Sequence, residues 1–145
     1  MRDTLIFLDV DAKDKQEAIR RTIDMMQASG AISSGDKFYQ AVMEREALGS
    51  TAIGKGLALP HARTQYVDEI IIALTRLKSG IAFDAADGEP VELIFLLGTP
   101  IKIVGEYLSV LAKLSKIVKD DKTRKKLLKA KSAVEIKSIF VEAET

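Results

Sequence analysis

The sequence predicts an α/β fold in which a mixed β-sheet is flanked by helices, as a single layered domain spanning residues 1–145. Three observations predict this class. Apolar residues recur at helical spacing in the first third of the chain, short apolar runs typical of buried strands fill the middle, and helical spacing returns in the last third. Helices and strands in this order pack as helical layers on a sheet.

The first third of the chain predicts one strand and two helices. A short apolar run at 5–8 favours an edge strand, and three aspartates at 9, 11 and 14 favour a turn and a helix start. The first helix begins at Lys15 and stops near Gly30, and its apolar side consists of Ala18, Ile19, Thr22, Ile23, Met26 and Gln27. A second helix runs from about Ser34 to Gly49, with an apolar stripe of Phe38, Ala41, Val42 and Ala47 or Leu48.

The middle of the chain predicts an irregular loop followed by strands. The loop covers residues 49–56, because it combines three glycines with Ser50 and Thr51. The apolar residues from Gly56 to Leu59 predict a short strand that Pro60 ends. Further strands are expected at 69–77, at 81–83 and at 91–97, with turn residues between the last two.

The last third predicts helices with a basic outer surface. A strong apolar stripe runs from Tyr107 to Val118, a basic helix covers 122–130, and Ser132 with Glu135 matches a capping box that opens a final helix. Lysines and arginines crowd the stretch 113–131, interleaved at helical spacing with Leu114, Ile117, Leu127 and Leu128. This spacing favours a solvated face of packed helices over a nucleic-acid site, although such a face could dock an acidic partner.

Composition excludes several classes of function. The content of 47% hydrophobic and 30% charged residues is ordinary for a globular protein, and the net charge of +1 gives no global field toward nucleic acid or an anionic membrane. No cysteine is present, which excludes disulfides and thiolate chemistry. No apolar stretch is long enough to insert in a membrane, and Met1-Arg2-Asp3 opens no signal peptide, so we expect a cytoplasmic protein.

One histidine, His61, is the strongest candidate for chemistry, because its side chain titrates near neutral pH. It follows Pro60, where we expect a strand end that feeds a shaped loop. A lone histidine is more often a residue without a chemical role, and this alternative stays open at this point. A zinc site would need more histidine or cysteine ligands, and no nucleophile elbow of a serine hydrolase is present.

Other candidate motifs are weaker. The segment Gly54-Lys55-Gly56 lacks the full phosphate-binding loop pattern, and it suits a flexible connector about as well as a phosphate cradle. The carboxylate pairs Glu44 with Glu46, and Asp84 with Asp87, are most simply solvated residues.

The remaining chemistry for His61 is acceptance of a phosphoryl group. This reaction needs a neutral imidazole with a lone pair on one ring nitrogen, while the other nitrogen donates to a fixed acceptor. It also needs donors around the phosphoryl oxygens. The Gly/Ser/Thr loop and the nearby Arg63 could supply them.

The segments 42–46 and 49–62, which include the Leu-Pro-His core, resemble the signature of the enzyme IIA domains of the fructose/mannitol class. These domains belong to the bacterial phosphoenolpyruvate-dependent sugar phosphotransferase system. The resemblance covers almost the whole chain. It implies that His61 accepts a phosphoryl group from the carrier protein HPr and passes it to a cysteine of enzyme IIB. Enzyme IIB then phosphorylates sugar during membrane transport through enzyme IIC. It implies no metal and no organic cofactor.

The resemblance also assigns supporting residues and shows two departures. Arg45 matches the arginine that holds phosphoryl oxygens, whereas Glu46 and Thr51 are expected to support the loop. Arg63 is expected to support it as well, because of its place near His61 and not because of the resemblance. Ala52 replaces a family glycine, and Tyr107 stands where many sugar-transport members carry a second histidine. A phenol can donate one hydrogen bond but carries no positive charge, so the hypothesis is a less stabilised phosphohistidine or slower transfer.

The resemblance leaves a second function open. Relatives of these domains act as regulators, including nitrogen-related signalling proteins, in which phosphorylation changes a binding partner. The missing second histidine favours that alternative modestly.

Overall fold

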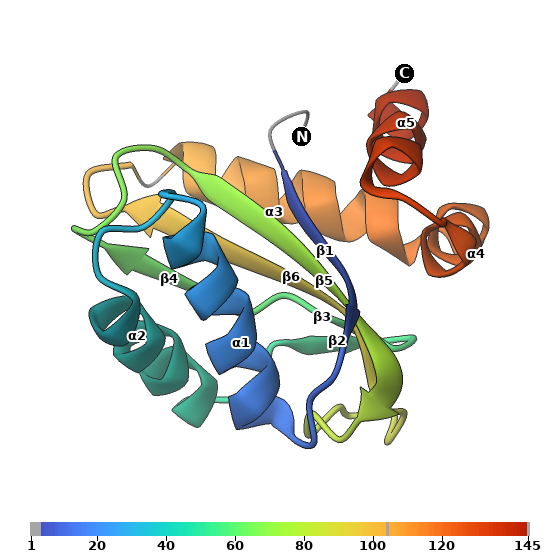
Figure 1. Cartoon of the computed structure of the whole chain (residues 1–145), viewed down its shortest axis with the longest axis horizontal. Helices are drawn as coiled ribbons and strands as arrows, with labels where there is room; N and C mark the ends of the chain where they lie inside the picture. Colours follow the sequence, from blue (N-terminus) through green and yellow to red (C-terminus); the bar gives the residue numbers. More distant parts are fainter. Residues whose placement is uncertain (1–3, 104, 145) are drawn as a thin grey trace.

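The computed structural model describes residues 4–103 and 105–144 and shows a mixed sheet between two layers of helices (Figure 1). The predicted α/β class is therefore confirmed. Met1, Arg2 and Asp3, on which the expectation about a signal peptide rests, lie outside the described residues. The elements are β1 (Leu5–Val10), α1 (Lys15–Ala28), α2 (Gly35–Ala47), β2 (Ala52–Gly54), β3 (Leu57–Ala58), β4 (His61–Thr64), β5 (Ile71–Ile81), β6 (Val91–Pro100), α3 (Gly105–Lys119), α4 (Asp121–Lys129) and α5 (Ala133–Glu144).

The sheet is built around an antiparallel pair of long strands, β5 and β6. Strand order is β1-β5-β6-β3-β2, and β4 also pairs with β6. β1 joins β5 in parallel, as the edge strand expected from its short apolar run, and β3 and β4 both join β6 in parallel. The outer hairpin of β2 and β3 is antiparallel.

Each face of the sheet has its own apolar core. On one face α1 and α2 pack on alternate strand residues, so that Ile19, Phe38 and Val42 lie in one cluster with Ile94 and Leu96. On the other face α3, α4 and α5 cover a second cluster, formed by Leu57, Leu59, Leu74, Leu93, Phe95, Leu97, Leu114, Val118, Leu127, Ala130, Ile136 and Phe140. The alternation along β6 follows the two-residue period of a strand, which places successive side chains on opposite faces.

α1 begins at a side-chain cap that the acidic turn predicted. Asp14 has extended backbone geometry, and its Oδ1 accepts from the backbone N–H of Glu17 at 2.8 Å. We expect Asp14→Ala to lower the free energy of unfolding by about 1 kcal/mol, because that N–H loses its acceptor. Chemical denaturation measures the change, and Asp11→Ala, an exposed aspartate before the helix, is the control. Equal stability of the two variants would contradict this account of the cap.

The strand that pairs with β6 is interrupted at Leu59 and Pro60, and this break positions the candidate site. β3 ends at Ala58, and β4 begins at His61, whose backbone partner is Leu97. Proline has no N–H, and it restricts the residue before it, so the ladder cannot run through this point. The Pro60 carbonyl still accepts from Leu97 N–H at 3.0 Å, which carries the chain across the gap.

Several local expectations need correction. His61 is the first residue of a strand and does not lie in a loop after one. The expected loop at 49–56 contains β2, and the apolar residues at 81–83 form no separate strand, because β5 continues to Ile81. Gln27, expected on the apolar side of the first helix, is exposed. β4 and the end of β5 form by pairing with β6, and local periodicity does not report such pairing.

The basic stretch 113–131 folds as expected, with one exception. Leu114 and Leu127 are buried, Ile117 packs against the same core, and the lysines of the stretch are exposed. Leu128, expected among the packed residues, is 36% exposed. The capping box is present in part: Glu135 N–H donates to Ser132 Oγ at 3.2 Å, but the Glu135 carboxylate accepts from Lys131 N–H.

Candidate functional site

His61 is held in one tautomer by the break in the strand. Its Nδ1 lies 2.7 Å from the carbonyl oxygen of Leu59. A carbonyl only accepts hydrogen bonds, so Nδ1 carries the proton and donates, and the lone pair of the neutral ring is on Nε2. Partial burial lowers the pKa of His61 below its usual 6.5, and the positive charge of Arg45 lowers it further. The hydrogen bond to Leu59 and the negative charge of Glu46 act in the opposite direction but do not cancel this shift. The ring is therefore neutral at physiological pH.

The single histidine makes this pKa directly measurable. We expect the one imidazole seen by NMR to titrate with a midpoint below 6.5, because burial disfavours the charged ring. A depressed pKa also means that the unfolded chain binds the proton more readily, so this residue's contribution to stability is present above pH 6.5 and is lost as the pH falls below it. The ring-nitrogen shifts should show Nδ1–H as the major neutral tautomer. A midpoint at or above 6.5, or an Nε2–H tautomer, would contradict this geometry.

His61 lines a cavity of about 340 Å³ between the glycine-containing loop and α3. The cavity is lined by both polar and apolar residues. The polar lining residues are Arg45, Ser50, Thr51, His61 and Ser115, and the apolar ones are Ala52, Ile53, Leu59, Leu111 and Ala112. A cationic guanidinium and a lone-pair nitrogen in one cavity suit an anionic group such as phosphoryl.

Arg45 and Tyr107, the two residues expected to stabilise a phosphoryl group, both lie at the histidine. Arg45 lines the cavity from the last turn of α2, and its Nη1 donates to the carbonyl of Gly49 at 2.9 Å. The ring of Tyr107, in the first turn of α3, lies 5.7 Å from the His61 ring between centroids, at an angle of 56°. Burial raises the pKa of Tyr107, so its hydroxyl keeps its proton and can donate.

Glu46 is buried beside the loop and is not a solvated residue. It is 6% exposed, and its carboxylate accepts from Thr51 N–H at 3.3 Å and from the Thr51 hydroxyl. Its counter-ion is Lys15, whose Nζ lies 2.7 Å away and whose side chain is 10% exposed. The expectation that Glu46 is solvated was wrong, because the helix spacing alone did not reveal a buried cation beside it.

Lys15 is the supporting residue that sequence reasoning missed. A signal was available, because Lys15 stands three and four residues before Ala18 and Ile19 and so continues the apolar stripe of the first helix. A lysine on such a stripe needs a buried partner. Its partner is on the next helix, so the pair fixes α1 against α2 directly below the loop that borders His61.

Arg63 lies on the same strand as His61 but contacts a different segment. Side chains two apart on a strand point to the same face, and the Arg63 guanidinium donates to the carbonyl of Ile101, just after β6. It therefore holds the connection that leads into α3, which carries Tyr107. Its charge also reaches Tyr107, where it acts to lower the pKa of the phenol.

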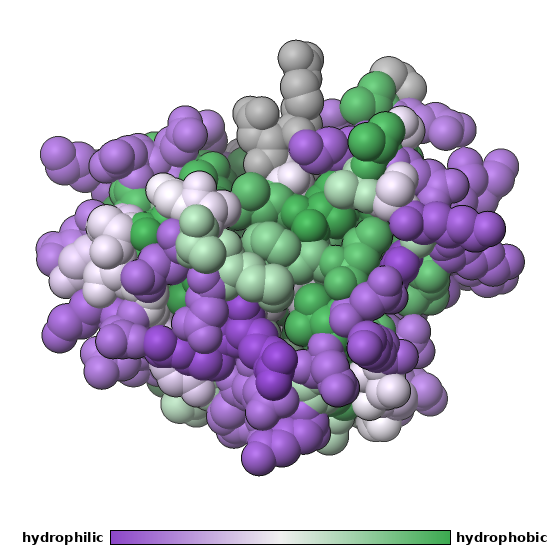
Figure 2. All heavy atoms as spheres, in the orientation of Figure 1, coloured by the Kyte–Doolittle hydropathy of each residue, from purple (hydrophilic) through white to green (hydrophobic). Residues whose placement is uncertain are grey.

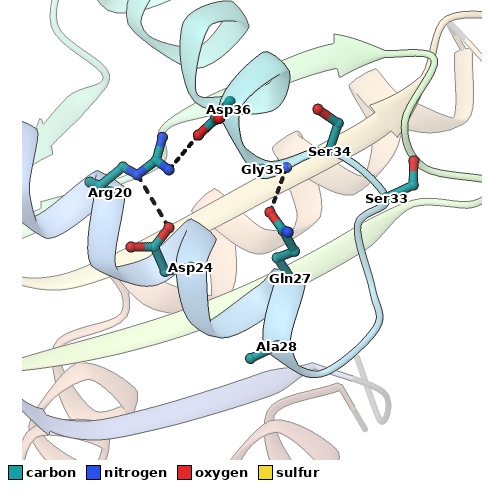
Figure 3. Close-up of a pocket in the computed structure, with 8 residues that line it drawn as sticks. All are labelled: Arg20, Asp24, Gln27, Ala28, Ser33, Ser34, Gly35 and Asp36. Carbon is teal, nitrogen blue, oxygen red and sulfur yellow. Dashed lines mark hydrogen bonds and ion pairs between the residues drawn. The ribbon is translucent and has the colours of Figure 1, made fainter.

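A larger cavity, of about 460 Å³, lies between α1 and the start of α2 (Figure 3). Its charged groups are already paired with one another: Arg20 contacts Asp24 at 3.2 Å and Asp36 at 2.5 Å. The Gln27 side-chain carbonyl accepts from Gly35 N–H at 2.7 Å. These contacts tie the two helices together. The candidate site is the smaller cavity at His61, because it combines a histidine with an arginine. In the part of the chain that the structure describes, no group of three potential metal ligands gathers.

The fold and the site together define a class of protein. In this class a mixed sheet lies between helices, and one histidine with a fixed tautomer lies beside an arginine. The chain belongs to the family described as "Phosphoenolpyruvate-dependent sugar phosphotransferase system, EIIA 2", whose model matches residues 1–143. The resemblance noted in the sequence is thus confirmed, and members of this family are phosphotransferase components.

Two curated relatives differ in length. The fructose-specific EIIA component of Haloferax volcanii is 32% identical over 138 residues, which are 95% of this chain and 90% of that protein. The fructose-specific EIIABC component of Bacillus subtilis is 32% identical over 127 residues, which cover 88% of this chain. The match spans only 20% of that longer protein.

Two solved structures share the fold. The nitrogen regulatory protein IIA-Ntr from Neisseria meningitidis aligns with a TM-score of 0.86 at 30% identity, over 96% of this chain and 94% of that one. Enzyme IIA of the mannitol system from Escherichia coli, solved in complex with phosphorylated enzyme IIB, aligns with a TM-score of 0.79 at 21% identity, over 97% and 95% of the two chains. At this identity the mannitol protein supports the fold alone.

Proposed function

We propose that this chain is a phosphoryl carrier in which Nε2 of His61 accepts a phosphoryl group from an HPr-type protein and passes it to enzyme IIB. The observation that carries the proposal is the bond from Nδ1 to the Leu59 carbonyl, which leaves Nε2 as the nucleophile. Family membership supports the reaction class, and the resemblance of the sequence to the enzyme IIA domains implies enzyme IIB as the acceptor.

The reaction needs little from other side chains. The Nε2 lone pair forms a bond to phosphorus while the bond between phosphorus and the donor's histidine nitrogen breaks, and that electron pair returns to the donor. The bond to Leu59 stabilises the positive charge that develops on the ring, because Nδ1 still donates to a fixed carbonyl. Attack of the enzyme IIB thiolate on the same phosphorus reverses the change at His61.

The surroundings support stabilisation of the phosphoryl oxygens. The Arg45 guanidinium has donors left beyond its bond to Gly49, and it lines the same cavity as His61. Tyr107 offers one hydroxyl donor from α3. The Lys15–Glu46–Thr51 contacts keep the loop that carries Ser50 at a fixed distance from α2.

The surface near the site is suited to contact with a protein partner. Three large apolar side chains are exposed on segments that border it: Leu48 is 85% exposed, Ile101 52% and Leu108 59%. Leu48 follows the helix of Arg45, and Leu108 follows Tyr107. Exposed apolar side chains gathered near a site favour contact with another protein. The expected cytoplasmic location stays a prediction.

The test is incubation with phosphoenolpyruvate, enzyme I and HPr, followed by intact-mass measurement. We expect the intact mass of the chain to increase by one phosphate and to return to its original value when enzyme IIB is added. No gain of mass would contradict a carrier function. A gain of mass that enzyme IIB proteins do not remove would favour the regulatory alternative.

Tyr107→His tests the departure from the sugar-transport pattern. An imidazolium adds a positive charge beside the phosphoryl group, which a phenol cannot supply, and one hydrogen bond to a charged group contributes about 1.5–3 kcal/mol. We therefore expect phosphorylation by phospho-HPr to be at least about 10-fold faster, or the phosphohistidine longer-lived, in the variant. Rapid-quench rates and hydrolysis half-lives measure this. Ser109→Ala, at an exposed position two residues further along α3, is the control and should behave as the wild type. Equal rates and half-lives of Tyr107→His and the wild type would show that Tyr107 does not limit the transfer.

A nitrogen-type regulatory function is the second candidate. It is favoured by the similarity to the IIA-Ntr structure and by Tyr107. Both functions use the same phosphohistidine and differ in what the phosphorylated protein binds. Comparing the partners retained by the phosphorylated and the unmodified chain separates them.

A further inference from the structure

The charge of this chain is segregated onto one part of the fold. Residues 113–131 hold nine lysines or arginines against two aspartates, and the remainder of the chain holds 13 basic against 19 acidic residues. The net charge of +1 therefore hides a strongly basic segment on an otherwise acidic molecule. That segment comprises the second half of α3 and all of α4.

Within this segment, α4 presents one face made of lysines. At 100° per residue, Lys122, Lys125, Lys126 and Lys129 project from one side, opposite the buried Leu127. All four lysines are exposed, and Figure 2 shows hydrophilic side chains covering this end of the molecule. We call these four residues the lysine face of α4.

The lysine face is neutralised only in part by its neighbours. Hydrogen bonds from Thr123 and the charge of Lys122 lower the pKa of Asp120, which caps α4. Lys126 approaches Glu142 of α5 at 3.5 Å, but among residues 4–103 and 105–144 no ion pair joins Lys122, Lys125 or Lys129 to a carboxylate. α1 differs, because Arg20 pairs with Asp24 and Arg21 with Glu17 at the helical i,i+4 spacing. Like charges at that spacing destabilise a helix, so the lysine face is a cost for folding that an external anion would relieve.

We propose that the lysine face of α4 adsorbs the protein to an anionic lipid surface. Its charges are ammonium groups, which act as hydrated point charges and suit a diffuse layer of headgroups, whereas bidentate phosphate recognition favours arginine. The stretch 113–131 holds no aromatic residue on which a nucleic-acid base could stack. A helix face is also convex, so it meets a flat surface without a groove.

The position of the face leaves the phosphoryl site free. α3 carries Tyr107 near one end, lines the cavity as far as Ser115, and leads into α4 at its other end, about 18 Å from Tyr107 along the axis. Figure 1 shows α4 on the side of the molecule away from β4, which begins with His61. Adsorption through α4 would hold the chain at a membrane while the cavity of His61 stays open to protein partners. No helix of the described chain has the length and apolarity to cross a bilayer, and adsorption requires none.

Vesicle flotation with the full chain tests the proposal. The probes are vesicles of phosphatidylcholine alone and vesicles that also contain phosphatidylglycerol. We expect binding only to the anionic vesicles and a decrease with added salt, since salt screens exposed charges. Lys122→Gln/Lys125→Gln/Lys129→Gln should weaken binding roughly 100-fold, because each lysine near such a surface contributes about a five-fold factor.

A matched variant separates the lysine face from net charge. Lys13→Gln/Lys37→Gln/Lys78→Gln removes the same charge from exposed positions outside α4 and should bind as the wild type does. Equal loss in both variants, or no binding to anionic vesicles, would overturn the proposal. Tighter binding to duplex DNA or to polyglutamate than to anionic vesicles would also overturn it, in favour of another polyanion. Phosphorylation of His61 should be the same in all three proteins, so this test stands apart from that of the carrier function.

Discussion

His61→Ala is expected to abolish phosphorylation of this chain. Incubated with phosphoenolpyruvate, enzyme I and HPr, the wild type should gain the mass of one phosphate, and the variant should gain none. The reason is that His61 is the chain's one histidine, with a lone pair fixed on Nε2 by the bond from Nδ1 to Leu59. Without it, the cavity offers Arg45 and hydroxyls but no nitrogen nucleophile.

The control for this experiment is Gln65→Ala, an exposed position just after the strand of His61. It should be phosphorylated at the rate of the wild type. Circular dichroism of His61→Ala should match the wild type, because the histidine is only half-buried and its loss opens no core cavity. Phosphorylation of the alanine variant to the same extent would place the phosphoryl group on another residue.

Glu46→Gln is expected to produce the largest loss of stability. The variant leaves the Lys15 ammonium, 10% exposed, without its partner at 2.7 Å. Breaking a buried ion pair from one side costs about 3–5 kcal/mol. We expect about 3 kcal/mol, the lower end, because Lys15 keeps Asp84 at 3.6 Å and the face of Phe83 at 4.8 Å.

Chemical denaturation measures this effect, and Glu44→Gln, an exposed carboxylate on the same helix, is the control. The control should stay within about 0.5 kcal/mol of the wild type. Adding Lys15→Met to Glu46→Gln should recover much of the loss, because no unpaired charge remains. Equal stability of Glu46→Gln and Glu44→Gln would show that the pair does not hold the loop.

The fold class and the helices could be predicted from the sequence because both depend on the spacing of apolar residues along the chain. The apolar residues of α1 and α3 repeat at helical spacing. Asp14 caps α1 by accepting from the N–H of Glu17, three residues further along the chain. The helix and strand periods are geometric properties of the chain itself. They can be read without knowing which strand pairs with which.

The details of the site could not be read locally, because they depend on residues far apart in the chain. β4 forms by pairing with β6, so the break that turns the Leu59 carbonyl toward His61 exists only in the folded sheet. The burial of Glu46 requires Lys15 from another helix. Part of the apolar lining of the cavity, Leu111 and Ala112, comes from α3, about 50 residues after the histidine.

NMR of the ¹⁵N-labelled phosphorylated chain shows directly whether Nε2 of His61 carries the phosphoryl group. We expect a phosphorus coupling to Nε2, with Nδ1 still protonated and donating to Leu59. Coupling to Nδ1 would contradict this expectation, because that nitrogen would then have lost the bond to the carbonyl that organises the site.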